Sequence, residues 1–262
     1  MNDLTITVVT VVYNDVKHIQ KTMDSVLSQT YSNMEYIVID GGSTDGTAEI
    51  IGSYSDKLSY WESEPDEGVY FAMNKAIEKV SGEYINFMNC GDWFASSSTV
   101  DEFFAQVKGR PDFVYGNHDV LLDTFTKHKK ALPLDTMWRG MSFSHQAVFT
   151  KTSLMKQRPF DTAFKVAADF NFIFEKYKKG CSFQYVDVKV TCYQEGGLSR
   201  KHVIRGYEEN WKTVKKWEDG IEIDRYYKKL IAIQRLIILI EKVLPKFVFN
   251  KLMQWKNKAK SA

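Results

Sequence analysis

The sequence predicts an α/β fold in which a mostly parallel β-sheet is flanked by helices, and three observations support this prediction. Short apolar runs rich in β-branched residues alternate with segments of helical periodicity through the first third of the chain. The runs are apolar at odd and even positions alike, which is typical of strands that helices cover on both faces. Acid-bearing loops follow the runs at their C-terminal ends. With 262 residues, the chain has the length of one large domain or of one domain with an appendage.

The first part of the chain alternates strictly between strands and helices. The run TITVVTVVY at 5–13 is the first strand, and Asn14 or Asp15 can cap the helix that follows. The other predicted strands are 35–40, 58–63 and 83–88, and the predicted helices lie around 19–27, 47–54 and 68–80. This β–α alternation indicates a parallel sheet.

Beyond Val100 the pattern becomes less regular. It predicts a helix at 100–107, short strands around 113–122, 143–150 and 183–190, and a helix carrying Phe170, Phe174 and Tyr177 at spacings of four and three. From about Lys201 the chain is predicted to be helical to its end, and no internal repeat is present.

Composition and motifs exclude several classes of protein. Hydrophobic residues make up 44% and charged residues 26%, which excludes a disordered or low-complexity chain. Three cysteines without a CxxC spacing indicate neither a disulfide framework nor a zinc ribbon, and they favour a reducing cytoplasm. The start of the chain lacks the features of a signal peptide, and no apolar run is long enough to span a membrane. Neither GxGxxG nor GxxxxGK[ST] occurs.

Four polar loops are predicted to meet at one edge of the sheet. They are residues 14–15, 40–45, 63–68 and 89–92, and each follows the C-terminal end of a predicted strand. Ligands of open parallel sheets bind outside those ends. Carboxylates there suit a hard divalent cation and, through it, a diphosphate.

The sequence resembles the family 2 glycosyltransferases of the GT-A fold over about residues 4–200. The resemblance rests on six pieces in the expected order. They are VVTVVYND at 8–15, YIVIDGGSTDGT at 36–47, SEPDEGVYFAMNKAI at 63–77, SGEYINFMNCGDWF at 81–94, SHQAVF at 144–149 and AADFNF at 167–172. It implies a GT-A-like domain over 1–204, a helical segment over 205–262, and transfer of a sugar from a nucleotide diphosphate with inversion at the anomeric carbon.

The resemblance assigns the nucleotide-sugar site residue by residue. Thr10 and Tyr13 would flank the nucleoside base, and Asp40 and Asp66 would bind the base and ribose. Carboxylates can accept hydrogen bonds from a base N–H or from ribose hydroxyls. Lys75 would approach a donor phosphate. The structural alternatives are an aromatic packed on the sheet for Tyr13, a turn or helix cap for Asp40, and a solvated helix lysine for Lys75.

The expected metal site departs from the family pattern. Two acids commonly follow the fourth strand, whereas this chain has Asn89, Cys90, Gly91 and Asp92. Asp92 is then the one anionic ligand for Mn²⁺ or Mg²⁺, because diphosphate oxygens and waters can complete an octahedral shell. The structural alternative for Asp92 is a helix N-cap, and Cys90 is expected to be a packed thiol.

The chemistry of inversion requires a base. The acceptor hydroxyl must lose its proton as it attacks the anomeric carbon, on the face opposite the leaving diphosphate. The resemblance places this base at Asp169, for which a helix N-cap is the alternative. His145 and Gln146 would lie on the acceptor or diphosphate side, and Arg200 would belong to a loop that closes over the donor.

The charge of the chain is unevenly distributed. The total is +2, but residues 225–262 contain ten Lys or Arg and one acid, Glu241, so that this segment carries +9 and the rest −7. Its apolar residues recur at spacings of three and four, with an interruption at Pro245. Such a basic amphipathic helix is predicted to lie on an anionic membrane surface, and the alternative is packing on the catalytic domain or on a second subunit in a homodimer. Nucleic-acid binding is not expected, because the body is acidic.

These observations lead to one hypothesis with two alternatives. The chain is expected to be an inverting glycosyltransferase that uses a nucleotide-sugar, UDP-sugar by default, and a saccharide or lipid-linked acceptor in surface polysaccharide synthesis, at the cytoplasmic face of the membrane. The alternatives are a sugar-nucleotide nucleotidyltransferase and a non-catalytic scaffold with a weakened metal site.

Overall fold

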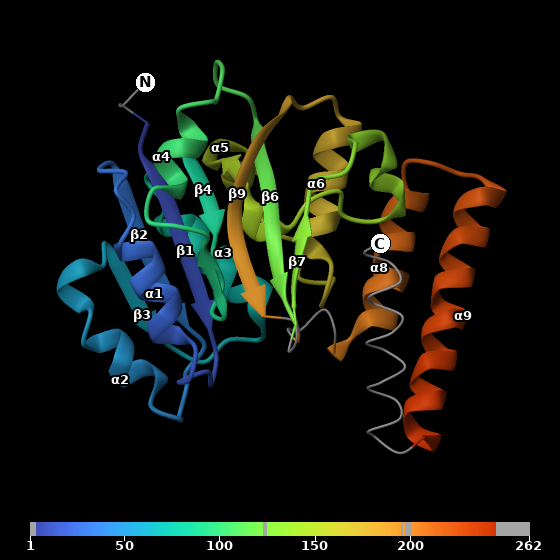
Figure 1. The fold of residues 1–262 in the computed structure, drawn as a ribbon, viewed down its shortest axis with the longest axis horizontal. Helices are drawn as coiled ribbons and strands as arrows, with labels where there is room; N and C mark the ends of the chain where they lie inside the picture. Colours follow the sequence, from blue (N-terminus) through green and yellow to red (C-terminus); the bar gives the residue numbers. More distant parts are fainter. Residues whose placement is uncertain (1–3, 123–124, 195, 197–200, 245–262) are drawn as a thin grey trace.

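A computed structural model describes residues 4–122, 125–194, 196 and 201–244 (Figure 1). Within these residues nine strands form one sheet, in the order β3-β2-β1-β4-β8-β6-β9-β5, with β7 paired to β6. The strands are β1 (Ile6–Val12), β2 (Met34–Asp40), β3 (Tyr60–Ser63), β4 (Tyr84–Phe87), β5 (Asp92–Phe94), β6 (Phe113–Leu121), β7 (Thr126–Lys129), β8 (Val148–Lys151) and β9 (Phe183–Gln194). The α-helices are α1 (Ile19–Leu27), α2 (Thr47–Gly52), α3 (Val69–Lys79), α4 (Thr99–Phe104), α5 (Thr152–Gln157), α6 (Ala168–Lys178), α8 (Val203–Lys215) and α9 (Ile221–Val243).

The first four strands form the parallel part of the sheet. β1 pairs in parallel with β2 and β4, and β2 pairs in parallel with β3. Val12 lies opposite Asp40, which in turn lies opposite Ser63, so the C-terminal ends of these strands share one edge. The predicted parallel pairing and the common edge are therefore confirmed for this part of the chain.

The remaining strands make the sheet mixed rather than mostly parallel. β8 is antiparallel to β4 and β6, β5 is antiparallel to β9, and β9 is parallel to β6. β6 and β7 are joined by residues 122–125 alone, which are too few for the crossover that parallel pairing needs. The predominantly parallel pairing that the sequence predicts therefore holds for β1 to β4, whereas in this half of the described sheet β6 and β9 form the one parallel pair.

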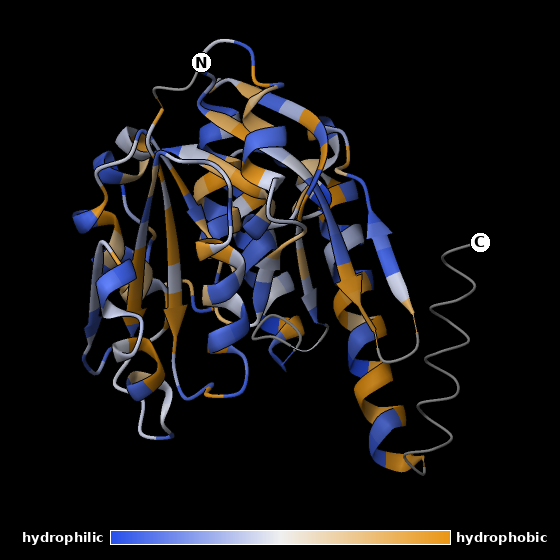
Figure 2. Cartoon of the chain, turned by 60° about the vertical axis from the view of Figure 1, so that its left-hand side comes forward, coloured by the Kyte–Doolittle hydropathy of each residue, from blue (hydrophilic) through white to orange (hydrophobic). Residues whose placement is uncertain are grey.

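Side chains on the two faces of the sheet enter two separate hydrophobic clusters. In β1, Ile6 and Val8 pack with α1 and α4 on one face, and Val9 and Val11 pack with α3 and α6 on the other. Burying each of these side chains contributes roughly 1.5–3 kcal/mol. This alternation explains why the strand is apolar at odd and even positions, and Figure 2 shows largely hydrophobic strands flanked by helices that carry both hydrophobic and hydrophilic residues.

The C-terminal helices belong to the same body as the sheet. α8 packs against both α6 and α9 at one flank of the molecule (Figure 1). Val214 of α8, together with Ile223 and Tyr227 of α9, is buried in the cluster that also contains the core residues of α3 and α6. Hydrophobic contacts therefore continue across the predicted boundary at residue 204. The predicted interruption at Pro245 and the segment beyond it lie outside the described residues.

Candidate functional site

Backbone hydrogen bonds connect the loops at the shared strand edge. The Gly41 N–H donates to Val12 O at 2.9 Å, the Glu64 N–H to Asp40 O at 3.0 Å, and the Cys90 N–H to Val11 O at 3.2 Å. The loops after β1, β2, β3 and β4 are thereby held side by side. The predicted convergence of four acid-bearing loops is confirmed.

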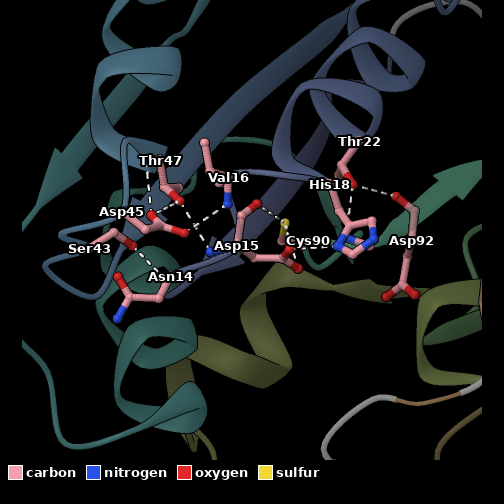
Figure 3. A network of polar contacts seen from close by, with 11 residues as sticks. Asn14, Asp15, Val16, His18, Thr22, Ser43, Asp45, Thr47, Cys90 and Asp92 are labelled. Carbon is pink, nitrogen blue, oxygen red and sulfur yellow. Dashed lines mark hydrogen bonds and ion pairs between the residues drawn. The ribbon is translucent and has the colours of Figure 1, made fainter.

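The loop after β1 is fixed by side chains of the loop after β2 (Figure 3). Asn14 has φ 48° and accepts a hydrogen bond from the Thr44 N–H at 2.8 Å, while its own N–H donates to Ser43 Oγ at 2.7 Å. Asp45 accepts from the Val16 N–H at 3.0 Å and from the Thr47 N–H at 3.1 Å. The hydrogen bond from the Thr47 hydroxyl lowers the pKa of Asp45. Asp45 thus secures the start of α2.

Two of the residues expected to bind the nucleoside are accessible at this edge. Tyr13 is 66% exposed just beyond the end of β1. Asp66 accepts from the Gly68 N–H at 2.7 Å, and its Oδ2 lies 2.8 Å from the position that a Cβ on Gly41 would occupy. Gly41 therefore allows the Asp66 carboxylate to approach the end of β2.

Asp40 lies at the same edge but is completely buried by its own partners. Its carboxylate accepts from the Ser43 N–H at 2.9 Å and from the hydroxyls of Ser43 and Ser63, both at 2.5 Å. In this conformation Asp40 orders the loops around it and offers no surface to a ligand. The geometry therefore supports the structural alternative for Asp40, in which its carboxylate stabilises the turn after β2.

Two other expected ligands have partners within the chain, and a third lies outside the described residues. Thr10 is fully buried, and its hydroxyl binds Met88 O at 2.7 Å, so a contact with a nucleoside base is closed to it. Lys75 lies 3.4 Å from a carboxylate oxygen of Glu62 and forms a second, longer pair with Glu64, because α3 faces β3 at this point. Arg200 lies outside the described residues.

Asp92 is a second buried acid at this edge. It is 9% exposed, and its Oδ2 accepts a hydrogen bond from Gln146 Nε2 at 2.8 Å. Burial raises the pKa of Asp92 to about 7, and the Gln146 hydrogen bond opposes part of that rise. Gly91, with φ +93°, provides the left-handed turn that brings Asp92 inward from β4. Asn89 Oδ1 is buried near this turn with no hydrogen-bond partner among the described residues.

Asp169 is held by two side chains from other parts of the chain. The Tyr70 hydroxyl of α3 lies 2.9 Å from Asp169 Oδ1, and His145 Nδ1 lies 3.4 Å from Asp169 Oδ2. His145 Nε2 lies 3.3 Å from Asn89 Nδ2. Burial lowers the pKa of His145, against the attraction of Asp169, so the ring is neutral near pH 7. With its proton on Nδ1, which faces Asp169, the neutral ring can accept a hydrogen bond from the Asn89 amide at Nε2.

The short 3₁₀ helix His145–Ala147 joins the two acids. Its first residue, His145, contacts Asp169, and its second, Gln146, contacts Asp92. Asp169 lies in the first turn of α6 and is not its N-cap, which is Ala167. The structure therefore brings together four of the predicted residues, Asp92, His145, Gln146 and Asp169.

Sequence reasoning missed Tyr70 and Asn89. Tyr70 lies on a predicted helix, and the apolar pattern of that helix does not indicate the role of the hydroxyl. Asn89 occupies a position where the family commonly has an acid, and the pattern does not indicate its contact with His145. Tyr70 is 7% exposed because its ring packs in the core while its hydroxyl reaches the site. Across the described residues, no group of three or more His, Cys, Asp and Glu side chains is arranged to hold a metal ion.

Comparisons with known proteins point to one family. The family model described as glycosyl transferase family 2 matches residues 7–179. An uncharacterized glycosyltransferase of Mycobacterium tuberculosis is 32% identical over 187 residues, covering 64% of this chain and 67% of its own. A "PGL/p-HBAD biosynthesis glycosyltransferase" of Mycobacterium bovis is 29% identical over 194 residues, covering 71% of this chain and 75% of its own.

Solved structures share the fold at low sequence identity. Residues 1–349 of Staphylococcus aureus TarS in complex with UDP-GlcNAc match with a TM-score of 0.65 at 18% identity, over 86% of this chain and 70% of that one. A mannosyltransferase of Pyrobaculum calidifontis in complex with GDP-Man and Mn²⁺ matches with a TM-score of 0.63 at 13% identity, over 98% of this chain and 80% of that one. Both similarities establish the GT-A type of fold for this chain.

Proposed function

This chain belongs to glycosyl transferase family 2, and we propose that it transfers a sugar from a nucleotide diphosphate to an acceptor hydroxyl with inversion at the anomeric carbon. The observation that carries this proposal is the pair of acids at one sheet edge, Asp92 and Asp169, joined through the helix His145–Ala147. We assign the binding of the leaving diphosphate to Asp92 and the role of the base to Asp169.

Asp169 is the proposed base. As the acceptor oxygen bonds to the anomeric carbon, the bond from that carbon to the diphosphate oxygen breaks and the hydroxyl proton passes to the Asp169 carboxylate. Tyr70 and His145 orient this carboxylate through Oδ1 and Oδ2 respectively. A positioned base of this kind contributes about 10²–10⁴-fold in rate.

The donor is proposed to bind along the loops after β1 and β3. Tyr13 offers an exposed ring for the base, and Asp66 offers a carboxylate to the ribose or base, while Asp40 holds the surrounding loops. We propose a UDP-sugar, with support from the UDP-GlcNAc complex of a protein that shares the fold. A thermal-shift screen of UDP, GDP and dTDP sugars tests this choice, and stabilisation by GDP-sugars alone would contradict it.

A divalent cation, Mn²⁺ or Mg²⁺, is proposed to accompany the donor. The chain's own groups fit such an ion, because Asp92 is a buried carboxylate with a raised pKa and Asn89 Oδ1 is a buried oxygen without a partner. When bound, the ion would neutralise the leaving diphosphate. Asp92→Asn is expected to abolish the effect of Mn²⁺ on UDP affinity, measured by calorimetry; an undiminished effect would exclude Asp92 as a ligand.

The acceptor is proposed to be a saccharide or lipid-linked intermediate of a cell-surface glycan. This proposal is supported by the name of the mycobacterial relative, which refers to PGL/p-HBAD biosynthesis. We place the reaction at the cytoplasmic face of the membrane, in agreement with the three free cysteines. No helix within the described residues has the length and hydropathy needed to cross a membrane.

α9 is proposed to contact that membrane. Leu236, Leu239 and Val243 are 56%, 58% and 73% exposed, and the end of the helix shows mixed hydrophobic and hydrophilic residues in Figure 2. Exposed apolar side chains among Lys and Arg suit an anionic surface. Co-sedimentation with vesicles containing phosphatidylglycerol tests this contact. Loss of binding in a Leu236→Asp, Leu239→Asp variant is expected, whereas concentration-dependent dimerisation without vesicle binding would assign the face to a second subunit.

The base is tested by Asp169→Asn. We expect transfer to fall by about 10²–10⁴-fold while UDP affinity is retained, because the change removes proton acceptance and little else. Asp219→Asn, in the exposed loop before α9, is the matched control. Undiminished transfer would exclude Asp169 as the base, failure of the wild type to bind any nucleotide diphosphate would favour a scaffold, and formation of a nucleotide-sugar from a nucleoside triphosphate would favour a nucleotidyltransferase.

A further inference from the structure

A carboxylate from α8 holds the segment that leads into α6. Glu209 accepts hydrogen bonds from the backbone N–H groups of Lys165, Val166 and Ala167, each at 2.9 Å. Glu209 is 9% exposed, and its Oε1 also accepts from Arg205 Nε at 3.0 Å. Its two oxygens are therefore fully engaged at the entrance to the helix that carries the proposed base.

The same segment is held from the opposite side by α3. The Tyr70 hydroxyl lies 2.8 Å from Val166 O, while the Val166 N–H donates to Glu209. α8 and α6 also share a buried hydrogen bond, in which the Thr213 hydroxyl donates to Asn171 Oδ1 at 3.2 Å. α6 is thus located between α3 and α8, and its first turn, with Asp169, is fixed by groups from both.

The charge of Glu209 suits this position. Burial alone would raise the pKa of Glu209, but the three backbone N–H groups and Arg205 outweigh burial and lower the pKa. The side chain therefore remains ionised near neutral pH. An anion at the N-terminus of a helix is stabilised by the unpaired N–H groups there, and hydrogen bonds to a charged acceptor are stronger than neutral ones.

We infer that Glu209 is a positioning residue for the transfer reaction, acting on Asp169 through the backbone of 165–167. Glu209 lies beyond residues 7–179, which the family model matches. The inference rests on the proposed role of Asp169 as the base. A displacement of about 1 Å at a reacting group can cost about 100-fold in rate, so a segment held by three hydrogen bonds is a sensitive point.

Glu209→Gln tests the inference on the full chain, with Glu208→Gln as the matched control. Glu208 is the preceding residue, is half-exposed, and pairs only loosely with Arg235 at 3.8 Å. In Glu209→Gln we expect kcat for transfer to fall about 10–100-fold while the Kd for UDP changes less than about twofold. Hydrogen exchange at the amides of 165–167 is expected to accelerate. Glu208→Gln is expected to leave all three measurements unchanged.

The outcomes separate this inference from the proposed function. Faster amide exchange with unchanged kcat would overturn the positioning role, as would equal losses in kcat and in UDP affinity. If Glu209→Gln does not fold, Arg205→Gln removes one partner of Glu209 and is expected to lower kcat in the same direction; unchanged kcat would again overturn the role. Full transfer by Asp169→Asn would instead refute the proposed base, and the amide exchange of 165–167 would still report whether Glu209 holds the segment.

Discussion

The hydroxyl of Tyr70 has one proton and two acceptors. It lies 2.8 Å from Val166 O and 2.9 Å from Asp169 Oδ1, both of which accept hydrogen bonds while Asp169 is ionised. Burial and the nearby Asp169 charge raise the pKa of Tyr70 well above its usual range, so the hydroxyl keeps its proton. Once Asp169 has taken a proton, that carboxyl can donate to the tyrosine oxygen, and Tyr70 can donate to Val166 O. The same side chain can therefore satisfy the base before and after the reaction.

Tyr70→Phe is expected to lower kcat about tenfold and to leave the Kd for UDP unchanged, because it removes one hydrogen bond to the base and none to the nucleotide. The free energy of unfolding is expected to fall by about 1–2 kcal/mol, since Val166 O loses a buried donor. Steady-state kinetics and urea denaturation measure the two effects. Tyr60→Phe, whose hydroxyl pairs with Glu62 on β3, serves as the control. An unchanged kcat would show that the tyrosine has no part in the reaction.

Individual site residues were predictable to different degrees. Asp92 and Asp169 follow recognisable motifs, and the structure joins them through Gln146 and His145. The placement of Lys75 was not predictable, because the acids that pair with it come from β3 and only the packing of α3 on the sheet brings them close. A motif identifies which residue types lie at the edge of the sheet. The ion pairs and hydrogen bonds that these side chains form with their neighbours decide which of them can still bind a ligand.

β6 carries a histidine next to the site that no motif marked. The ring of His118 stacks on Tyr193 of β9 with centroids 5.7 Å apart, and its Nδ1 is buried without a hydrogen-bond partner among the described residues. Burial lowers the pKa of His118 to about 4, with Lys129 and His145 adding to the effect and Asp119 opposing it. The folded chain therefore holds this ring neutral.

The depressed pKa of His118 predicts a loss of stability in acid. Above about pH 6.5 the ring is neutral in both states; between about 6.5 and 4 the unfolded chain binds a proton that the folded chain does not. The free energy of unfolding should therefore decrease across this interval, by up to about 3 kcal/mol from this group. His118→Gln should show a smaller decrease, measured by urea denaturation at several pH values, whereas His202→Gln at an exposed site should follow the wild type. Parallel curves for wild type and His118→Gln would contradict this assignment.

Most strands and helices were predictable from the sequence, but β5 and β7 were not. The predicted strands at 5–13 and 35–40 match β1 and β2 closely. β5 and β7 have three and four residues, too few for a period of two to be detected, and they form because β9 and β6 offer partners. These two strands are stabilised by hydrogen bonds to neighbouring strands, and the periodicity of the sequence does not predict such pairing.

The molecule as a whole is stabilised by its C-terminal helices. Tyr227 of α9 is completely buried, its ring is parallel to that of Trp211 on α8 with centroids 6.3 Å apart, and its hydroxyl donates to Trp138 O at 2.9 Å. The sequence predicted an amphipathic helix here and left open what it packs on. Its buried side proved to belong to the central core because three distant segments meet at this tyrosine.

Tyr227→Ala is expected to reduce the free energy of unfolding by about 3–5 kcal/mol, the usual effect of removing a large buried ring. Leu239→Ala, on the exposed side of the same helix, is expected to change it by less than about 0.5 kcal/mol. Urea denaturation followed by tryptophan fluorescence compares the two. A single transition in the wild type is expected, since one core serves the whole chain; an early, separate loss of α9 would contradict this.

The anchoring of 165–167 by Glu209 also affects when the enzyme becomes active during its synthesis. Asp169 is synthesised before β9 and α8. In the nascent chain the N–H groups of 165–167 therefore still lack Glu209 as their hydrogen-bond acceptor. The Asp169 carboxylate, the proposed base, therefore takes its final position only when the last third of the chain has emerged.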